Sequence, residues 1–129
     1  MNGFIGIKED LSQIVLSFQG KRIPEKMTFF KFVKVPFLAV EHGEIHDGFY
    51  RAFLSVRELV VEKIRDLLKL NETANIFVTG HGLGAVISTL CALDVKQTLS
   101  IKGERISIYT FGAPRIGDQN FSDYADASL

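Results

Sequence analysis

Cysteine is nearly absent from this chain of 129 residues, which contains Cys91 alone. An internal disulfide is therefore excluded, and because Cys91 lies in an apolar stretch we predict a small buried side chain rather than a reactive thiol. Long apolar runs are also lacking, since the longest, residues 83–93, is interrupted by Ser88 and Thr89 and is too short to span a bilayer. The sequence therefore does not predict an integral membrane protein.

Net charge is a second absence. Lys plus Arg and Asp plus Glu number 15 each, so no overall field attracts the chain to nucleic acid or to an anionic membrane. Residues 1–11 show no cationic segment followed by a long apolar stretch, so no signal peptide is visible and we expect the chain, as written, to be cytoplasmic. No residue pattern predicts a metal or another cofactor. The length and the hydrophobic content of 47% suit one globular domain, residues 1–129.

The first part of the chain contains short extended segments. Residues 4–7 and 13–18 are rich in β-branched and aromatic side chains and are separated by a polar stretch, which predicts an antiparallel hairpin. Residues 20–26 form a polar loop. Residues 29–40 are aromatic and β-branched but include Pro36, which predicts irregular structure ending in a short strand.

The most secure helix is predicted over residues 49–70. Apolar side chains recur there at steps of three and four, with charged side chains around the rest of the cylinder. These apolar residues are Phe49, Phe53, Val56, Val60, Ile64 and Leu67. Asp47 is the expected N-terminal cap, and Asn71 is the expected stop.

Strands and helices alternate through the rest of the chain. We expect a strand at 75–79, a Gly-rich turn at 80–84, a helix from 83 to about 99, a strand at 105–111 and a helix that starts near Gln119. This order is typical of a parallel sheet with right-handed crossovers. The predicted fold is α/β: a partial, mostly parallel sheet with an N-terminal antiparallel hairpin and helices on both faces.

The turn between the second strand and its helix contains Gly80, His81, Gly82, Leu83 and Gly84. A turn between a strand and a helix is the place where the nucleophile-elbow pattern Gly-x-Ser-x-Gly occurs. This sharp turn needs small residues around a strained apex. Gly82 occupies the apex, so we expect the turn to persist without a hydroxyl. Taken alone, the pattern also fits an ordinary turn or a phosphate-binding loop.

Four segments resemble the motifs of one family, in the family's order. Residues 77–84 are similar to its elbow except at Gly82, and residues 14–20 resemble its upstream strand ending in Phe-Arg-Gly. Residues 46–49 resemble its His-x-Gly-Phe element, and residues 110–117 its Phe-Gly-x-Pro-Arg-x-Gly element. The family is the class 3 (fungal-type) lipase domain of the α/β-hydrolase fold, and the resemblance covers about residues 4–124.

The resemblance implies hydrolysis of acylglycerols or related esters by a serine, histidine and aspartate triad. Gly82 stands at the nucleophile position, and the family's aspartate and histidine lie beyond the last motif, whereas this chain ends at Leu129. The family's oxyanion-hole donors correspond to the N–H groups of Lys21 and Leu83, although Gln19 replaces the usual arginine before the loop. We therefore expect a truncated and catalytically inactive domain.

No other side chain is a convincing substitute for the triad. We expect Ser88 to pack inside its helix, and His81 and His46 to be packing or orienting residues. The remaining candidates are expected to be solvated or to lie near a helix start: His42, Asp118, Asp123 and Asp126.

Residues 21–37 match the lid-bearing loop of the family and combine five basic residues with aromatic side chains. They could contact a membrane or lipid-droplet surface, or the aromatic residues could line the core while the lysines are solvated. Two alternatives to a hydrolase therefore stay open. One is a lipid-binding or regulatory module, and the other is a non-functional product that self-associates through an exposed sheet edge.

Overall fold

The computed structural model describes residues 2–20, 34–37 and 43–129. Its main sheet begins with the predicted hairpin, in which β1 (Gly3–Ile7) pairs antiparallel with β2 (Gln13–Phe18). Asp10 closes the turn, because its carboxylate accepts hydrogen bonds from the backbone N–H and the hydroxyl of Ser12, at 2.9 and 2.6 Å. Alternate β2 side chains are buried, as expected of a strand with one face on the core.

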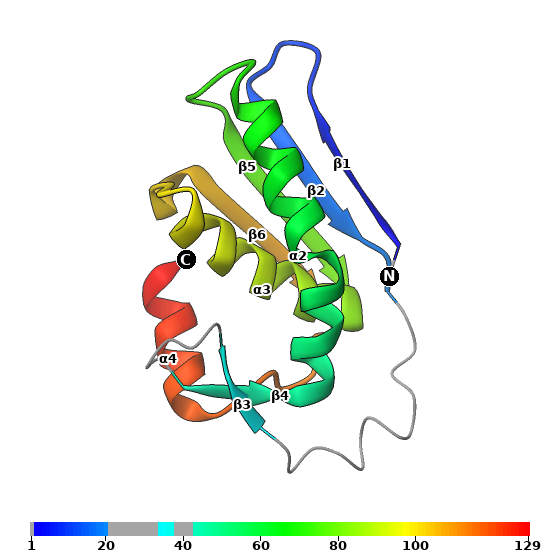
Figure 1. Ribbon diagram of the computed structural model, residues 1–129, viewed down its shortest axis with the longest axis vertical. Coiled ribbons are helices and arrows are strands. Elements are labelled where there is room, and N and C mark those ends of the chain that lie inside the picture. The colour runs from blue at the N-terminus through cyan, green and yellow to red at the C-terminus, as the bar shows by residue number, and fades with distance from the viewer. Residues whose placement is uncertain (1, 21–33, 38–42) are drawn as a thin grey trace.

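Two parallel strands extend this hairpin. β5 (Asn75–His81) pairs with β2, and β6 (Ile106–Phe111) pairs with β5, so the order is β1-β2-β5-β6 (Figure 1). The crossovers contain α2 (Asp47–Leu68) and α3 (Leu83–Thr98), and a short 3-10 helix, Gly103–Arg105, precedes β6. The predicted partial α/β fold, mostly parallel and led by an antiparallel hairpin, is confirmed.

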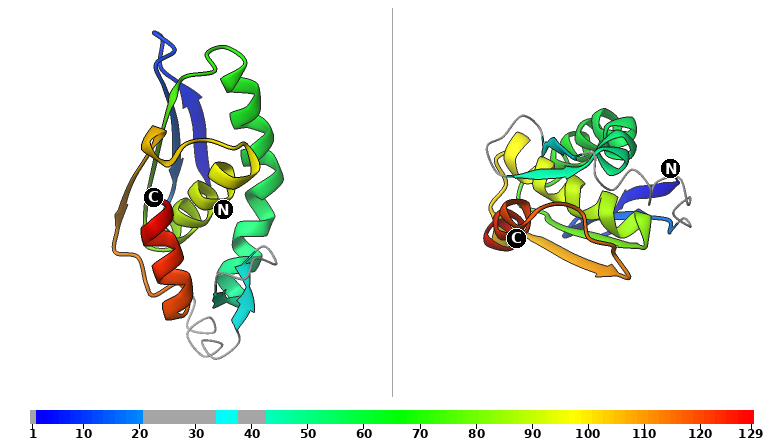
Figure 2. Two further views of the ribbon diagram at one scale, coloured as in Figure 1. Left: turned by 90° about the vertical axis from the view of Figure 1, so that its left-hand side faces the viewer. Right: turned by 90° about the horizontal axis from the view of Figure 1, so that it is seen from below.

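Both crossover helices lie on the same face of the sheet (Figure 2). α3 packs directly on β2, β5 and β6, while α2 packs on α3 and β1. The expectation of helices on both faces does not hold for the described residues. The chain steps from β2 to β5 to β6 in one direction, and right-handed crossovers that step in one direction place their helices on one face.

The opposite face of the sheet is open in the described part of the chain. Phe4, Tyr109 and Phe111 are exposed there, and the rings of Phe77 and Tyr109 lie 5.3 Å apart. The core lies between the covered face and the helices, where Ile14, Leu16, Ile76 and Val78 of the strands are almost fully buried.

The N-terminal cap of α2 differs from the prediction. His46, not Asp47, is the cap: its Nδ1 accepts a hydrogen bond from the Gly48 N–H at 3.0 Å. Asp47 is the first helical residue, where its carboxylate forms an ion pair with Arg51 at 2.9 Å. Histidine is an uncommon cap, so the usual preference for Asp misplaces the cap by one residue.

A second, two-stranded sheet lies at one end of the molecule. β3 (Lys34–Pro36) pairs antiparallel with β4 (Glu44–His46), which leads into α2. The last helix, α4 (Gln119–Ser128), contacts β4, and the ring of Phe121 packs against buried Phe37 at 5.7 Å. β3 lies within residues 29–40 and includes Pro36, whereas residues 38–40, at the end of which the short strand was expected, lie outside the described residues. Among the residues the structure describes, no helix is long and apolar enough to cross a membrane.

Candidate functional site

Gly82 forms the apex of the sharp turn between β5 and α3. Its backbone has φ 59° and ψ −124°, a conformation that residues with a side chain rarely adopt. The Gly82 N–H donates to the Phe111 carbonyl of β6 at 2.9 Å, and its own carbonyl accepts from Ala85 at 3.1 Å. The strained apex predicted from the sequence is therefore present, and it carries no side chain.

The glycines on either side of the apex are required by close packing. A Cβ atom on Gly80 would lie 2.3 Å from the Gly84 carbonyl oxygen and 2.7 Å from the Ser88 hydroxyl. A Cβ atom on Gly84 would lie 2.6 Å from the Phe18 carbonyl oxygen at the end of β2. The helix thus approaches the sheet so closely that only hydrogen fits at either position, which distinguishes this turn from a merely flexible loop.

His81 lies across the carboxyl ends of three strands. A Cβ atom built on Gly20, just after β2, would be 2.9 Å from the His81 Nδ1 atom. One built on Gly112, just after β6, would be 3.3 Å from its Nε2 atom. The imidazole therefore packs against two glycines, which fits the expected packing role. The contact of His81 with Gly112 was not predicted from the sequence. Gly112 has a φ of 63°, and the only indication of this in the sequence is the Phe-Gly pair of the last motif.

Leu83 begins α3 directly after the apex and is buried. Its N–H is one of the first donors of the helix, and it donates to no acceptor among the described residues. The second predicted donor, Lys21, lies outside the described residues. Within the described part of the chain, the Leu83 N–H is thus a backbone donor beside Gly82 without an acceptor.

Ser88 does not replace a nucleophile at the apex. Its side chain is fully buried within α3, and its hydroxyl donates to the Thr79 carbonyl of β5 at 2.8 Å. This hydrogen bond fixes the helix to the strand two turns from the site. The packing role predicted for Ser88 is confirmed.

The other candidate acids and bases lie elsewhere. His46 is buried at the start of α2 with its ring 4.8 Å from that of Phe49, as expected of a structural histidine. Asp118 caps α4 by accepting from the Phe121 N–H at 2.9 Å, and Asp123 accepts from Gln119 in the same helix. Asp126 lines a polar cleft between α4 and α3, and His42 lies outside the described residues.

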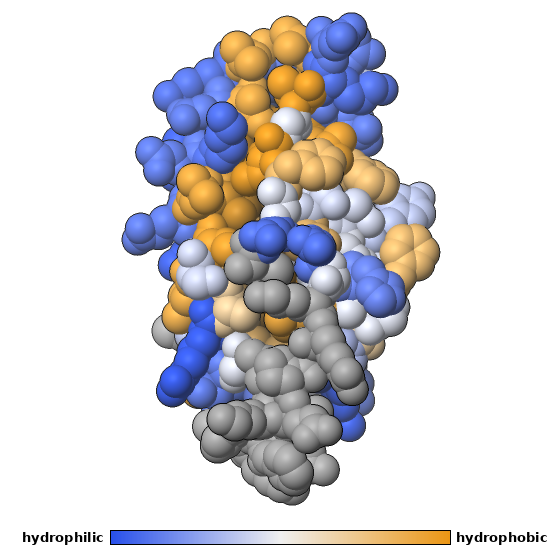
Figure 3. Space-filling model, turned by 90° about the vertical axis from the view of Figure 1, so that its right-hand side faces the viewer, coloured by the Kyte–Doolittle hydropathy of each residue, from blue (hydrophilic) through white to orange (hydrophobic). Residues whose placement is uncertain are grey.

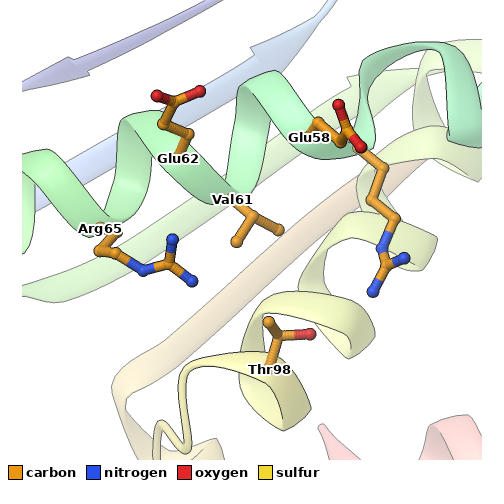
Figure 4. Close-up of a pocket in the computed structure, with 6 residues that line it drawn as sticks. Glu58, Val61, Glu62, Arg65 and Thr98 are labelled. Atoms are coloured by element: carbon orange, nitrogen blue, oxygen red, sulfur yellow. The ribbon is translucent and has the colours of Figure 1, made fainter.

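A cleft between α2 and α3 is not at the elbow either. It encloses about 380 Å³. Figure 4 shows the side chains of Val61 and Arg65 facing this cleft and that of Glu62 pointing away from it. None of the elbow residues Gly80, Gly82 and Gly84 lines it, nor do they line the two other clefts described. Within the same residues no group of His, Cys, Asp and Glu side chains could hold a metal ion.

Residues 9–129 match the family model of Lipase (class 3). The chain belongs to the class 3 lipase family. This class 3 lipase chain is 34% identical over 94 residues to a lipase of Rhizomucor miehei, a match that covers 72% of this chain and 26% of the relative. It is also 39% identical over 83 residues to phospholipase A1-IIalpha of Arabidopsis thaliana, covering 57% of this chain and 20% of that protein.

A solved structure supports the fold of this class 3 lipase chain. The native Rhizomucor miehei lipase propeptide complex superposes with a TM-score of 0.87 at 29% identity, over 98% of this chain and 42% of that one. The chain thus spans about a quarter of the length of the curated lipase and less than half of the solved one.

Proposed function

We propose that this chain binds acyl lipids or related carboxylic esters as a class 3 lipase module and does not hydrolyse them through the serine mechanism. The observation that carries the proposal is Gly82, which holds the strained conformation of an elbow apex without a hydroxyl. One solved structure, 28% identical to this chain, is that of a triacylglycerol lipase whose catalytic centre is a serine protease triad. Without an apex oxygen, no acyl-enzyme can form at this position.

The expected loss of rate is large. In subtilisin, removing the nucleophile alone lowers kcat by roughly a millionfold. The catalytic activity that remains comes from substrate binding and the oxyanion hole. Here the N–H of Leu83, which has no acceptor among the described residues and lies at the positive end of α3, is suited to donate to a carbonyl oxygen. Polarisation of a carbonyl without an attacking group favours binding over turnover. A second donor from Lys21 stays a prediction.

The test compares the natural chain with Gly82→Ser and Gly82→Ala on short- and long-chain p-nitrophenyl esters, and measures binding of a non-hydrolysable trialkylglycerol ether. We expect no turnover by the natural chain and retained binding of the ether. The alanine variant is the matched control, because it adds the same Cβ atom as serine without the hydroxyl. Turnover by the natural chain above that of Gly82→Ala, or absence of ether binding, contradicts the proposal.

Contact with a lipid surface through residues 21–37 is part of the same proposal. The five basic residues and the aromatic side chains of this segment suit an anionic interface. Flotation with phosphatidylserine vesicles should recover the natural chain and lose a Lys31→Glu, Lys34→Glu variant. Equal recovery of the two proteins argues against surface contact.

Self-association of the chain is a further part of the proposal. Among the described residues β6 pairs only with β5, so its outer edge presents unpaired backbone groups, and Ile106–Phe111 contains no charged residue. Sedimentation equilibrium should show reversible association that weakens in a Tyr109→Lys variant. A monomer at high concentration excludes it. Cytoplasmic residence likewise stays a prediction.

A further inference from the structure

A second cleft lies between the hairpin and α2, on the side of the molecule away from β6. It encloses about 340 Å³, within the range of small-ligand sites. Figure 3 shows apolar side chains gathered over this side of the molecule. The lining residues are Gly3, Phe4, Ile5, Leu16, Phe18, Val56, Leu59, Val60 and Lys63.

The cleft has a buried apolar floor and an exposed apolar rim. Leu16 and Val60 are almost fully buried beneath it, while Leu59 of α2 is 68% exposed at one side and Ile5 of β1, which pairs with Leu16, is half-buried at the other. An extended hydrocarbon chain laid between these two side chains would remove apolar surface of both partners from water, which is the main source of affinity for such a ligand.

Lys63 is the one charged residue among the lining residues. Within the described part of the chain, no carboxylate lies within 4.0 Å of its ammonium group, and the nearby Asp66 is paired with Lys69 at 3.4 Å. A cation beside an otherwise apolar cleft complements a ligand with one hydrocarbon chain and one anionic end.

We propose that this cleft binds a long-chain carboxylate, that is a free fatty acid, with the chain between Ile5 and Leu59 and the carboxylate at Lys63. The site differs from the elbow, since neither Gly82 nor Leu83 lines it. It goes beyond the proposed function and does not depend on it: ester binding at the elbow and fatty-acid binding in this cleft can each be present without the other.

The experiment titrates the natural chain with laurate and with dodecanol below their aggregation concentrations, by displacement of the fluorescent fatty acid cis-parinaric acid. Leu59→Glu should weaken laurate binding by roughly tenfold or more, because it places a second carboxylate against the hydrocarbon chain. Leu70→Glu is the matched control: it changes another exposed leucine, 58% accessible and outside the cleft, in the same way. Both positions are exposed enough for the variants to fold.

The carboxylate contact is tested by Lys63→Glu. This variant should weaken laurate binding by roughly fivefold and leave dodecanol binding unchanged, because only laurate carries a charge. Amide chemical shifts should move at Val56, Leu59 and Lys63 on adding laurate, and not at residues 80–84. Absence of laurate binding, equal effects of Leu59→Glu and Leu70→Glu, equal loss of laurate and dodecanol in Lys63→Glu, or shifts confined to 80–84 each overturn the proposal. The last outcome would leave the elbow proposal standing.

Discussion

The guanidinium of Arg57 in α2 holds the carboxylate of Asp94 in α3 through two hydrogen bonds, of 2.8 and 3.2 Å. The Thr98 hydroxyl donates a third to the same carboxylate at 2.9 Å. Asp94 is fully buried, whereas the Arg57 side chain is 37% exposed. The hydrogen bond to Asp94 holds the pKa of Arg57 above its ordinary value. The helical pattern predicted only that charged side chains such as Arg57 lie outside the apolar stripe of α2.

Removing one partner of this pair should not cost the same as removing the other. Arg57→Leu leaves a buried carboxylate with only Thr98, which should lower the free energy of unfolding by about 3 kcal/mol. Asp94→Asn leaves a guanidinium that can reach water, which should cost about 1 kcal/mol. Urea unfolding of both variants measures the difference. Arg51→Leu, which removes the exposed pair with Asp47, is the control and should cost less than about 0.5 kcal/mol.

The glycines of the elbow should tolerate no side chain. Gly80→Ala and Gly84→Ala would each force backbone apart, and we expect a loss of about 1–3 kcal/mol in the free energy of unfolding. Gly6→Ala is the control, because its Cβ atom meets nothing within 4 Å, and it should be neutral or slightly stabilising. Denaturant titration gives all three values. Equal effects at the three positions would mean that α3 lies farther from the sheet.

Cys91 should be chemically silent in the folded protein. Burial raises the pKa of its thiol far above the ordinary value, and its side chain has almost no accessible surface. Reaction with a disulfide reagent such as DTNB should be negligible in native buffer and complete in urea. Rapid stoichiometric labelling of the native chain would support the reactive-thiol alternative instead.

The start of α4 should depend on pH through Asp118. Hydrogen bonding from the Phe121 N–H lowers the pKa of this carboxyl below 3.8. Because the folded state has the lower pKa, the cap contributes stability that is present above pH 3.8 and is lost as the pH falls through the lowered pKa. Asp118→Asn, which keeps an acceptor oxygen without titrating, should remove this dependence.

Asp118→Ala removes the cap itself and should lower the free energy of unfolding by about 1 kcal/mol at neutral pH. Unfolding free energies of the three proteins between pH 2.5 and 6 test both points, and parallel profiles for the natural chain and Asp118→Asn would contradict the assignment.

Much of the fold follows from local patterns that tertiary contacts reinforce. The hairpin, both long helices and β6 were predicted within two residues, because alternation and a helical repeat of apolar side chains both report a buried face. The strand β5 runs two residues beyond the predicted end, since Gly80 and His81 still pair with β6. The cap of α2 was misplaced because His46 uses its imidazole as a cap, a choice that capping preferences do not favour.

The faces of the sheet could not be read from the sequence in the same way. The spacing of strands and helices predicts crossovers, but which face a helix covers depends on the order of strands across the sheet. The elbow was predicted from the spacing of the glycines around Gly82, although the need for glycine at position 84 comes from its contact with Phe18 of β2. The pair of Arg57 and Asp94, 37 residues apart, and the contacts of His81 with Gly20 and Gly112 come from packing that no single segment encodes.

The conformation of Gly82 also bears on how this elbow can change over time. At φ 59° a serine pays a conformational penalty of about 1 kcal/mol or more that glycine does not, so in an active hydrolase only selection for turnover keeps the less stable residue in place. A chain with glycine at this position has relaxed the strained residue and gained thermodynamic margin. Reversion to serine would lower the stability of the folded chain. We therefore expect glycine to be retained at this position unless catalysis is again under selection.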